Sequence, residues 1–470
     1  MKKKAPLCAV LVLVLNSMPF AFPCALFAAM SGGAAQGIKA DCDNALIKYP
    51  DIYAEAPVIP EVPAPSRAAV RLEPAVGPAG EEAVWDGYFQ QLGTAVKKGG
   101  LTECGTDKLE LLVDGREVIN SVAPDIKNAV SFVHIEIFQW QADETGAAFR
   151  DLLAEKVRGG VRVRVILDRL GSSLTLLGSL ERKFVDSMRK EGIEVKVREF
   201  QLLHLDHRKV MVMDDGHGGL VAYTGGMNIG DDYQRNWHDQ QTRVAGPAVG
   251  QLHRSFLDSW KNITGEKLSG FPEQRSVEGG ARTYVITHVG GDTDRNIKRA
   301  YLLAINTARS LIRIEDPYFT DKDIIAALIK AATDPQRPGL KVQLVVPLKD
   351  DMQVTLHAFR SKYPDLLKAG IEVYEYQPRM EHLKVAVMDH LWATAGSSNL
   401  DPQSLKYNNE MNLIVLDRNF AEEMDRRIFD EDIARSLRIT SYSPNLADAI
   451  SGHLPFLAPP SPLPAGLLTL

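Results

Sequence analysis

Apolar residues follow two kinds of spacing along most of this chain, and the two kinds alternate. Spacing of three or four residues indicates one face of a helix, whereas short continuous or alternating apolar runs are typical of strands. In the first half of the body, this pattern predicts a helix over 125–132, a strand over 133–139, a helix over 147–157 and a strand over 161–168. A further helix is expected to end at 191–192, where the strand IEVKVREF follows.

The same order of segments returns in the second half of the body. It predicts a helix over 297–308, a strand over 311–314, a helix over 324–332 and a strand over 341–347. A helix ending at 369–370 and the strand IEVYEY follow, and a glycine (Gly160 or Gly339) marks the helix-to-strand turn of each half. Alternating helices and strands favour layered domains. We therefore expect an α/β fold of two similar α-β-α layered domains, packed face to face as an internal pseudo-dimer.

The N-terminal segment has the order of features of a secretory signal peptide. Lysines at 2–4 precede an apolar stretch at 9–15, and small residues follow at 28–33. The alternative is an uncleaved membrane anchor, because apolar residues resume at 18–30 and the total length approaches that of a span. Pro19 and Pro23 interrupt this stretch and favour export. Either interpretation places the body outside the cytoplasm, in the periplasm or against the outer side of the inner membrane.

Composition divides the chain into a body and its flanking segments. The predicted parts are a signal peptide or anchor at 1–35, a Pro/Ala-rich linker at 36–100, a first domain at 101–270, a second domain at 271–440 and a Pro-rich tail at 441–470. Cys42 and Cys104 lie outside the leader and either form a disulfide or remain as two thiols. The formal net charge of -6 provides no basic field for a polyanion, so no nucleic-acid partner is expected.

Both halves carry the same His-x-Lys-x4-Asp pattern at the same place in the repeat. Its residues are His207, Lys209 and Asp214 in the first half, and His382, Lys384 and Asp389 in the second. The apolar tetrapeptides VMVM and VAVM between lysine and aspartate predict a buried strand. Histidine and lysine are expected on one face of it, because they are two residues apart.

A glycine-containing segment and then a carboxylate follow each motif. The segments contain Gly225, Gly226 and Asn228 in the first half, and Gly396, Ser397 and Asn399 in the second. The carboxylates are Asp239 in NWHD and Glu410 in NNE. One such motif is weak support for a function, but two at equivalent positions of a repeat indicate one shared active site.

These residue types suit the cleavage of a phosphodiester. One imidazole can attack phosphorus and form a phosphohistidine, and the other can protonate the leaving alcohol. A carboxylate on the far nitrogen of each ring fixes its tautomer, while lysine and asparagine neutralise the non-bridging oxygens. The catalytic candidates are therefore His207, Lys209, Asn228, Asp239, His382, Lys384, Asn399 and Glu410. No segment has metal-ligand spacing, so neither a metal nor a cofactor is expected.

Neighbouring residues are expected to have structural roles. Asp214 and Asp389 should order their loops rather than contact substrate, and His217 should be exposed in a turn. His204 would not lie beside His207 in a strand, which argues against a metal-binding pair. The four-residue spacing of Leu252, Phe256 and Trp260 predicts the core face of a helix.

On these motifs the chain resembles the phospholipase D superfamily, and within it the bacterial cardiolipin synthases. The segments of narrower similarity are HRKVMVMDD, TGGMNIGDDY and WHDQQTRVAGPAV in the first half, and EDPYF, VPLKDD, YEYQPRMEHLKVAVMD and GSSNLDPQSLKYNNEMNLIV in the second. The resemblance implies a bilobal fold with both motifs at one cleft. It also implies condensation of two phosphatidylglycerols into cardiolipin and glycerol, without a cofactor, by a protein that meets its phospholipid substrate at a membrane surface.

The resemblance further implies that His207 is the nucleophile and His382 the acid, whereas the nearly symmetric residues leave this choice open, as they do the oligomeric state. The chain departs from the subfamily in its leader, at Pro338-Gly339-Leu340 and at Pro402-Gln403, where relatives usually carry an arginine. The last difference bears on the choice of acceptor. A secreted phospholipase D or a nuclease, with water as acceptor, and a catalytically silent membrane-associated scaffold are the alternatives.

Overall fold

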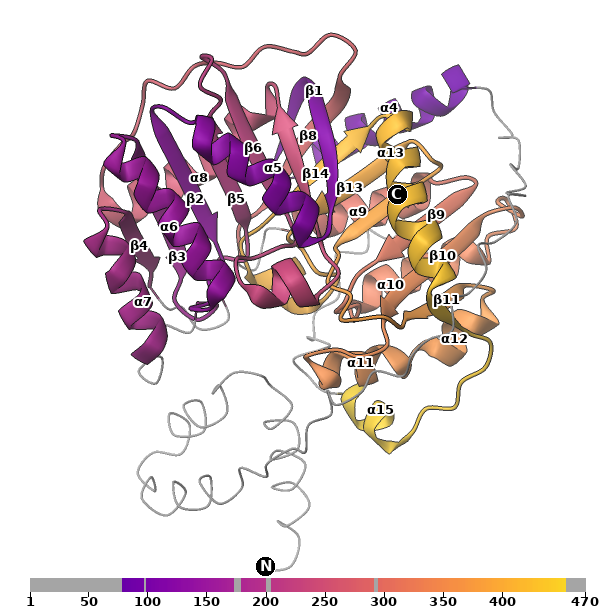
Figure 1. Ribbon diagram of the computed structural model, residues 1–470. Coiled ribbons are helices and arrows are strands. Elements are labelled where there is room, and N and C mark those ends of the chain that lie inside the picture. Colours follow the sequence, from indigo (N-terminus) through magenta and orange to yellow (C-terminus); the bar gives the residue numbers. More distant parts are fainter. Residues whose placement is uncertain (1–77, 97–98, 173–178, 200–203, 291–294, 454–470) are drawn as a thin grey trace, which may run out of the picture. The chain divides into compact units, whose positions relative to one another are not determined.

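The computed structural model describes residues 78–96, 99–172, 179–199, 204–290 and 295–453. The predicted leader, most of the predicted linker, Cys42 and the end of the predicted tail lie outside the described residues. One compact unit comprises Val76–Asp350 and Thr355–Leu470 and contains both His-x-Lys-x4-Asp motifs, while a second unit is described only at 351–354. Figure 1 shows the helices and strands.

Fifteen strands of the described chain form one mixed sheet. Their bounds are β1 (Leu101–Val113), β2 (Phe132–Ile137), β3 (Arg162–Asp168), β4 (Glu194–Arg198), β5 (Lys209–Asp214), β6 (Leu220–Gly225), β7 (Gln240–Ala245), β8 (Ala281–His288), β9 (Leu311–Glu315), β10 (Lys341–Pro347), β11 (Glu372–Tyr376), β12 (Val385–Met388), β13 (Trp392–Gly396), β14 (Glu410–Leu416) and β15 (Ser436–Ile439). The order across the sheet is β15-β11-β10-β9-β12-β13-β14-β8-β1-β7-β6-β5-β2-β3-β4 (Figure 1).

This order repeats once about the centre of the sheet. The strands β7-β6-β5-β2-β3-β4 follow β1 on one side, and β14-β13-β12-β9-β10-β11 follow β8 on the other. In each half the last three strands pair in parallel and carry a helix between successive strands. The prediction of two similar α/β layered domains is therefore confirmed.

The two halves join edge to edge through β1 and β8. Residues 101–107 of β1 pair antiparallel with β8, and residues 108–113 pair antiparallel with β7. The two domains therefore meet at their sheet edges, and the expected face-to-face packing was wrong. Joining the edges satisfies the backbone groups of two strands that would otherwise be open, and it places β5 and β12, which follow the two motif histidines, symmetrically about the centre.

Helices cover both faces of the sheet. Their bounds are α4 (Pro78–Ala95), α5 (Asp114–Asn128), α6 (Glu144–Arg158), α7 (Ser179–Lys190), η1 (Asp232–Asn236), α8 (Ala248–Thr264), α9 (Asn296–Thr307), α10 (Lys322–Ala332), α11 (Gln353–Arg360), α12 (Tyr363–Lys368), η2 (Gln403–Tyr407), α13 (Arg418–Met424), η3 (Asp425–Phe429), α14 (Asp430–Ala434) and α15 (Leu446–Ser451). The three η elements are single turns of π-helix.

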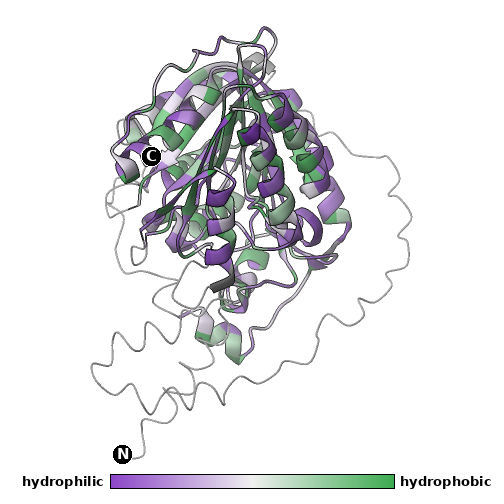
Figure 2. Cartoon of the chain, turned by 60° about the vertical axis from the view of Figure 1, so that its left-hand side comes forward, coloured by the Kyte–Doolittle hydropathy of each residue, from purple (hydrophilic) through white to green (hydrophobic). Residues whose placement is uncertain are grey.

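Strand β5 shows why the motif strands are apolar on both faces. Val210 and Val212 belong to the cluster that contains Leu252 of α8, while Met211 and Met213 belong to the cluster that contains Val118 of α5. Successive side chains of a strand point to opposite faces, so a strand covered on both sides reads as a continuous apolar run. In Figure 2 the strands are largely hydrophobic, whereas the helices around them carry both colours.

Three expected segments differ from the structure. The helix predicted at 125–132 begins eleven residues earlier, at Asp114, and ends at Asn128. Pro124 lies inside this helix, whereas a proline in a sequence commonly indicates the first turn of one, so the start was predicted too late. The end of the predicted linker is the helix α4, which buries Trp85 against Trp392 at 5.8 Å between ring centroids. The predicted tail contains the short helix α15, whose N-terminus is closed by the capping box of Asn445 and Asp448.

Candidate active site

The two motif histidines lie just before their strands rather than within them. Strand β5 begins at Lys209 and β12 at Val385, so His207 and His382 are in the connecting segments. Each lysine turns back on its own histidine: Lys209 Nζ donates to the carbonyl oxygen of His207 at 2.6 Å, and Lys384 Nζ to that of His382 at 2.5 Å. The lysine therefore fixes the backbone from which the imidazole projects.

Each histidine is paired with the carboxylate of the opposite half. His207 Nδ1 lies 3.1 Å from Glu410 Oε1, and His382 Nδ1 lies 2.7 Å from Asp239 Oδ2. All four side chains are almost completely buried. The pairing holds the proton on Nδ1 of each ring, so Nε2 is the nitrogen that takes part in chemistry. The structure thus brings both predicted histidine–carboxylate sets together, and it crosses them.

Backbone hydrogen bonds fix this crossing. His207 N donates to Asn409 O at 3.0 Å, and Asn409 N donates to Leu205 O at 2.8 Å. The equivalent bonds in the other direction run from His238 N to Met380 O at 2.7 Å and from His382 N to His238 O at 2.8 Å. The residue before each carboxylate is therefore tied to the segment before the other half's histidine, which sets the distance between ring and carboxylate.

The predicted glycines allow close backbone approach at the ends of β6 and β13. A Cβ at Gly226 would lie 2.3 Å from Asp239 Oδ1, and one at Gly225 would lie 2.4 Å from Gln240 O. At Gly396 the Cβ would meet Asn412 Oδ1 at 2.3 Å. Any side chain at these positions would displace the strand that carries the carboxylate.

Ser397 takes the place of Gly226 in the second half and contributes a hydroxyl. Its Oγ donates to Glu410 Oε2 at 2.5 Å, and Asn408 Nδ2 donates to Glu410 Oε1 at 3.2 Å. Although burial opposes ionisation, His207 and Lys209 lower the pKa of Glu410 below its ordinary value. Glu410 is therefore held as an anion.

Asp239 has fewer donors than Glu410. Besides His382, it accepts from the backbone N–H of Gln240 at 2.8 Å. Burial raises its pKa to about 7, although Lys384 opposes the change. The two histidine–carboxylate pairs thus have the same arrangement, but the pKa of the carboxylate is lowered in one pair and raised in the other.

Burial also affects the basic groups of the site. It lowers the pKa of His207, with Lys209 and Lys384 acting in the same direction and Glu410 against it. It lowers the pKa of Lys209 to about 7. Because Lys384 affects both His207 and Lys209, the two motifs belong to one electrostatic environment.

The two predicted asparagines lie in the glycine-containing segments, each held by a hydrogen bond. Asn228 Oδ1 accepts from the backbone N–H of Gln139 at 3.0 Å, which directs its amide NH2 away from that bond. Asn399 Nδ2 lies 3.3 Å from Ser404 Oγ in η2. Both side chains are buried, and amide donors at these positions can neutralise an oxyanion.

Aromatic rings that sequence reasoning missed surround the histidines. Phe138 packs edge-on to His207 at 4.8 Å, and Trp237 and Tyr318 lie 5.0 and 6.1 Å from His382, measured between ring centroids. Trp237 precedes the carboxylate-bearing segment and follows the π-turn η1, just as Asn408 follows η2. Single π-turns are frequent at functional sites. A π-turn before each carboxylate would have indicated the site, but a π-turn has no recognisable pattern in a sequence.

The two motif aspartates anchor the neighbouring strand, and Asp214 also orders its own loop by accepting from the backbone N–H of Gly216 at 3.2 Å. Asp214 accepts from the backbone N–H groups of Val130, Ser131 and Phe132 at 2.8–3.0 Å, at the start of β2. Asp389 accepts in the same way from residues 309–311, at the start of β9. Both aspartates therefore have a hydrogen-bonding role, and most of their donors lie in the neighbouring segment rather than in their own loop.

The remaining predicted residues lie as follows. His217 is exposed, and Leu252, Phe256 and Trp260 are buried along α8. His204 Nε2 lies 2.9 Å from Asn409 Oδ1, whereas His207 contacts Glu410. Cys104 is half-buried.

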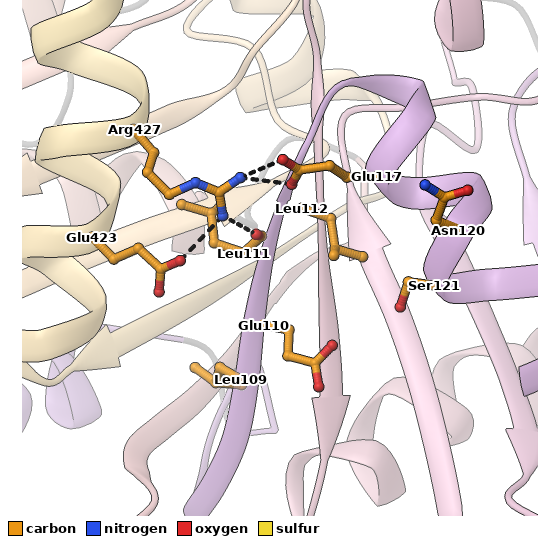
Figure 3. Close-up of a pocket in the computed structure, with 9 residues that line it drawn as sticks. All are labelled: Leu109, Glu110, Leu111, Leu112, Glu117, Asn120, Ser121, Glu423 and Arg427. Atoms are coloured by element: carbon orange, nitrogen blue, oxygen red, sulfur yellow. Dashed lines mark hydrogen bonds and ion pairs between the residues drawn. The ribbon is translucent and has the colours of Figure 1, made fainter. Parts of the chain in front are cut away.

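A pocket of about 590 Å³ lies between α5, β1 and the α13–η3 segment, and none of the candidate residues lines it (Figure 3). Arg427 enters this pocket, but Glu117, Glu423 and the carbonyl oxygen of Leu111 already bind its guanidinium. It therefore offers no free cation to a phosphate, and the histidine site remains the candidate for chemistry. Among the residues that the structure describes, no helix could span a bilayer.

Comparison with known proteins relates both halves of the chain to cardiolipin synthases. A family model described as "Cardiolipin synthase, PLD-like domain" matches residues 122–260 and 301–433. The chain is 31% identical to a probable cardiolipin synthase of Bacillus subtilis (strain 168), over 71% of this chain and 67% of that protein. It is 34% identical to a cardiolipin synthase of Geobacillus kaustophilus (strain HTA426), over 65% of this chain and 62% of that protein.

A solved structure supports the fold independently. The crystal structure of phosphatidylserine synthase from Haemophilus influenzae Rd KW20 superposes with a TM-score of 0.58 at 14% identity, covering 78% of this chain and 96% of that chain. At this identity the similarity shows the arrangement of elements and not the activity. Both family matches contain one His-x-Lys-x4-Asp motif each.

Proposed function

This chain belongs to the phospholipase D-like family of the cardiolipin synthases, and from that premise we propose that it transfers a phosphatidyl group through a phosphohistidine. The proposed reaction joins two phosphatidylglycerols into cardiolipin and releases glycerol. The crossed pairing of His207 with Glu410 and of His382 with Asp239 is the observation that carries this proposal.

In the first step, His207 Nε2 attacks the phosphorus of the donor lipid. The bond from phosphorus to the head-group glycerol oxygen breaks, and the proton on His382 Nε2 passes to that oxygen. A nucleophile must be unprotonated, and burial lowers the pKa of His207, which supports this assignment. Glu410 accepts a hydrogen bond from the Nδ1–H group of His207 and stabilises the positive charge that develops on the ring.

In the second step, the glycerol hydroxyl of another lipid attacks the phosphohistidine. His382 Nε2 removes its proton, the bond from phosphorus to His207 breaks, and the enzyme returns to its starting state. Asp239 holds His382 in the orientation that both proton transfers need. The two steps together convert two phosphatidylglycerols into one cardiolipin and one glycerol, and they need no other reactant.

Negative charge on the phosphorus oxygens is neutralised by donors already in place. The ammonium groups of Lys209 and Lys384 lie beside their histidines, and the amides of Asn228 and Asn399 follow in the next segment. Preorganised donors in a buried site stabilise a developing charge more than water does, because they need no reorientation.

The acceptor is the part of the proposal that needs testing most. Water at about 55 M competes with a lipid hydroxyl unless the site orients the alcohol and excludes bulk water. The almost complete burial of both histidines and the aromatic rings of Phe138, Trp237 and Tyr318 support exclusion of water. The alternative is a hydrolase that releases phosphatidic acid.

Gln403 stands where relatives usually carry an arginine, and it is linked to the site. Its Nε2 donates to Asn408 Oδ1 at 2.8 Å, and Asn408 donates to Glu410. The neutral amide of Gln403 thus holds Asn408 in place beside Glu410 without adding a positive charge to the site. This difference favours a change in acceptor preference over a loss of the histidine chemistry.

The test is to incubate the purified protein with labelled phosphatidylglycerol in bilayers, alone and with phosphatidylethanolamine, and to separate the lipid products. Cardiolipin together with free glycerol is expected. Cardiolipin with ethanolamine, formed only when the second lipid is present, would indicate another phosphatidyl donor. Phosphatidic acid as the sole product would leave a hydrolase and overturn the synthase.

A further inference from the structure

A second group of buried ionisable residues lies beside the site, around the imidazole of His238. Glu315 at the end of β9 and Asp432 in α14 contribute carboxylates to this group. One ligand-type atom of each of the three residues lies within 4.8 Å of the corresponding atoms of the other two. The three side chains come from residues 77 and 117 positions apart, so no spacing in the sequence could reveal them.

Glu315 is the unusual member of the group. It is 0% exposed, and no N–H group of the described structure donates to either of its carboxylate oxygens, which face the carboxylate of Asp432. One oxygen of the neighbouring Glu381, also 0% exposed, likewise accepts from no N–H group of the described structure. A buried carboxylate without donors is costly, typically by several kcal/mol, and normally takes up a proton or binds a cation.

The duplication of the fold provides an internal comparison. Glu136 occupies the position in β2 that Glu315 occupies in β9, and it is paired with Arg208 at 3.1 Å and lies 3.9 Å from Arg198. In the second half, the position of Arg208, directly after the motif histidine, is Leu383. The second half has therefore kept the glutamate and lost the cation that compensates it.

The rest of the surroundings adds negative charge. His238 Nδ1 bonds to Asp114 at 2.7 Å, and Arg379 pairs with the same carboxylate. His238 Nε2 lies 2.9 Å from Asp432, and the ring of Tyr376 stacks on the imidazole at 5.1 Å. Glu136 and Asp206 of the first half face the guanidinium groups of Arg198 and Arg208, whereas no arginine of the described residues pairs with Glu315 or Glu381.

We propose that His238 Nε2, Glu315 and Asp432 bind one divalent transition-metal ion of the zinc class. One imidazole and two carboxylates are a donor set that such ions accept. Asp114 on Nδ1 is the outer carboxylate that commonly orients a ligating histidine and fixes its tautomer.

The ion would have a structural role. Its ligands come from the segment before β7, from β9 and from α14, so it would join three distant segments. His238 directly precedes Asp239 and accepts the backbone N–H of His382 on its carbonyl oxygen. Fixing His238 therefore positions the His382–Asp239 pair, while the proposed phosphatidyl transfer runs through no metal.

Metal analysis of the full-length protein, purified without chelator from zinc-supplemented medium, tests the site. We expect about one zinc per chain, a lower Tm after removal by a strong chelator, and recovery of the Tm when zinc is returned. Cobalt substitution should give visible d–d absorption bands with an intensity typical of four or five ligands that include nitrogen.

The matched variants use the duplication. Glu315→Gln should reduce bound zinc at least about tenfold, whereas Glu136→Gln, its counterpart in the first half, should leave it unchanged. Should Glu315→Gln fail to fold, the zinc content and the Tm response of the unaltered protein decide the question. An unaltered protein that holds no zinc, manganese or iron, and whose Tm is indifferent to chelator and zinc, would overturn the site and leave a cluster that shares protons. Because none of these measurements involves lipid, they are independent of the proposed transferase activity.

Discussion

Glu410 of the second half hydrogen bonds to the imidazole of His207 in the first half, with Nδ1 3.1 and 3.2 Å from the two carboxylate oxygens. The reverse pair, His382 with Asp239, is 2.7 Å apart. Neither half therefore contains a histidine oriented by its own carboxylate. A single half expressed alone would hold an unsupported imidazole, so the duplicated chain acts as one catalytic unit.

His207→Ala and His382→Ala should each reduce product formation at least about a thousandfold, because one removes the proposed nucleophile and the other the proton donor. The measurement is lipid turnover by purified variants with unchanged thermal unfolding. His217→Ala, in an exposed turn, is the matched control and should retain activity. Substantial turnover by either site variant would show that the two-histidine mechanism is wrong.

Glu410→Gln should slow turnover by about two to four orders of magnitude. A neutral amide neither fixes the His207 tautomer that carries the proton on Nδ1 nor stabilises the positive charge of the imidazolium. Glu423→Gln, on α13, removes a carboxylate that pairs with Arg427 in the separate pocket, and it serves as the control. Rapid quenching of the reaction with the unaltered protein should trap the phosphate on His207. Finding it on His382 would reverse the proposed roles.

Asp214→Ala should destabilise the protein by about 2–4 kcal/mol, because the backbone N–H groups of 130–132 would lose their acceptor. The turnover of the molecules that remain folded should change little. Urea unfolding together with activity per folded molecule measures the two effects separately. Loss of turnover at full stability would instead place Asp214 in the chemistry.

Stability should fall in acid partly because of the buried pair His134 and His253, whose Nδ1 and Nε2 lie 2.9 Å apart. Burial lowers the pKa of His253 from 6.5 to about 4, so the unfolded chain binds a proton in this window that the folded chain does not. Stability contributed by keeping this ring neutral is present above pH 6.5 and is lost progressively toward pH 4, by about 3 kcal/mol.

The check is urea unfolding at several pH values between 4 and 7. His253→Gln should reduce the slope of unfolding free energy against pH, and His217→Gln should leave it as it is. Equal slopes in all three proteins would assign the acid sensitivity to other groups.

Export would be seen as processing of the N-terminus. The first residue of the mature protein is expected between Ala28 and Gly37, because small residues of the kind that precede cleavage sites occur there. N-terminal sequencing of the protein recovered from its native compartment provides the measurement. A chain that still begins at Met1 would favour the membrane anchor.

Most of the elements, the duplication and the residue types of the site could be predicted from the amino-acid sequence alone. Apolar periodicity is local, so the strand around VMVM and the helix carrying Leu252, Phe256 and Trp260 could be read directly. The motifs at His207 and His382 were recognisable because both copies keep the same order of His, Lys, Gly, Asn and carboxylate. Helix α4 was missed because proline and alanine dominate the segment before it, while its buried Trp85 contacts Trp392, over 300 residues away.

Only the tertiary structure decided which carboxylate serves which histidine. Within one half, each carboxylate follows its own motif closely in sequence, but the backbone bridges from Asp206 to Asn409 and from His238 to Glu381 cross the pairs over. The same holds for the edge-to-edge joining of the sheet and for the meeting of His238, Glu315 and Asp432. These contacts depend on how distant segments pack, and packing between segments leaves no periodic trace along a single chain.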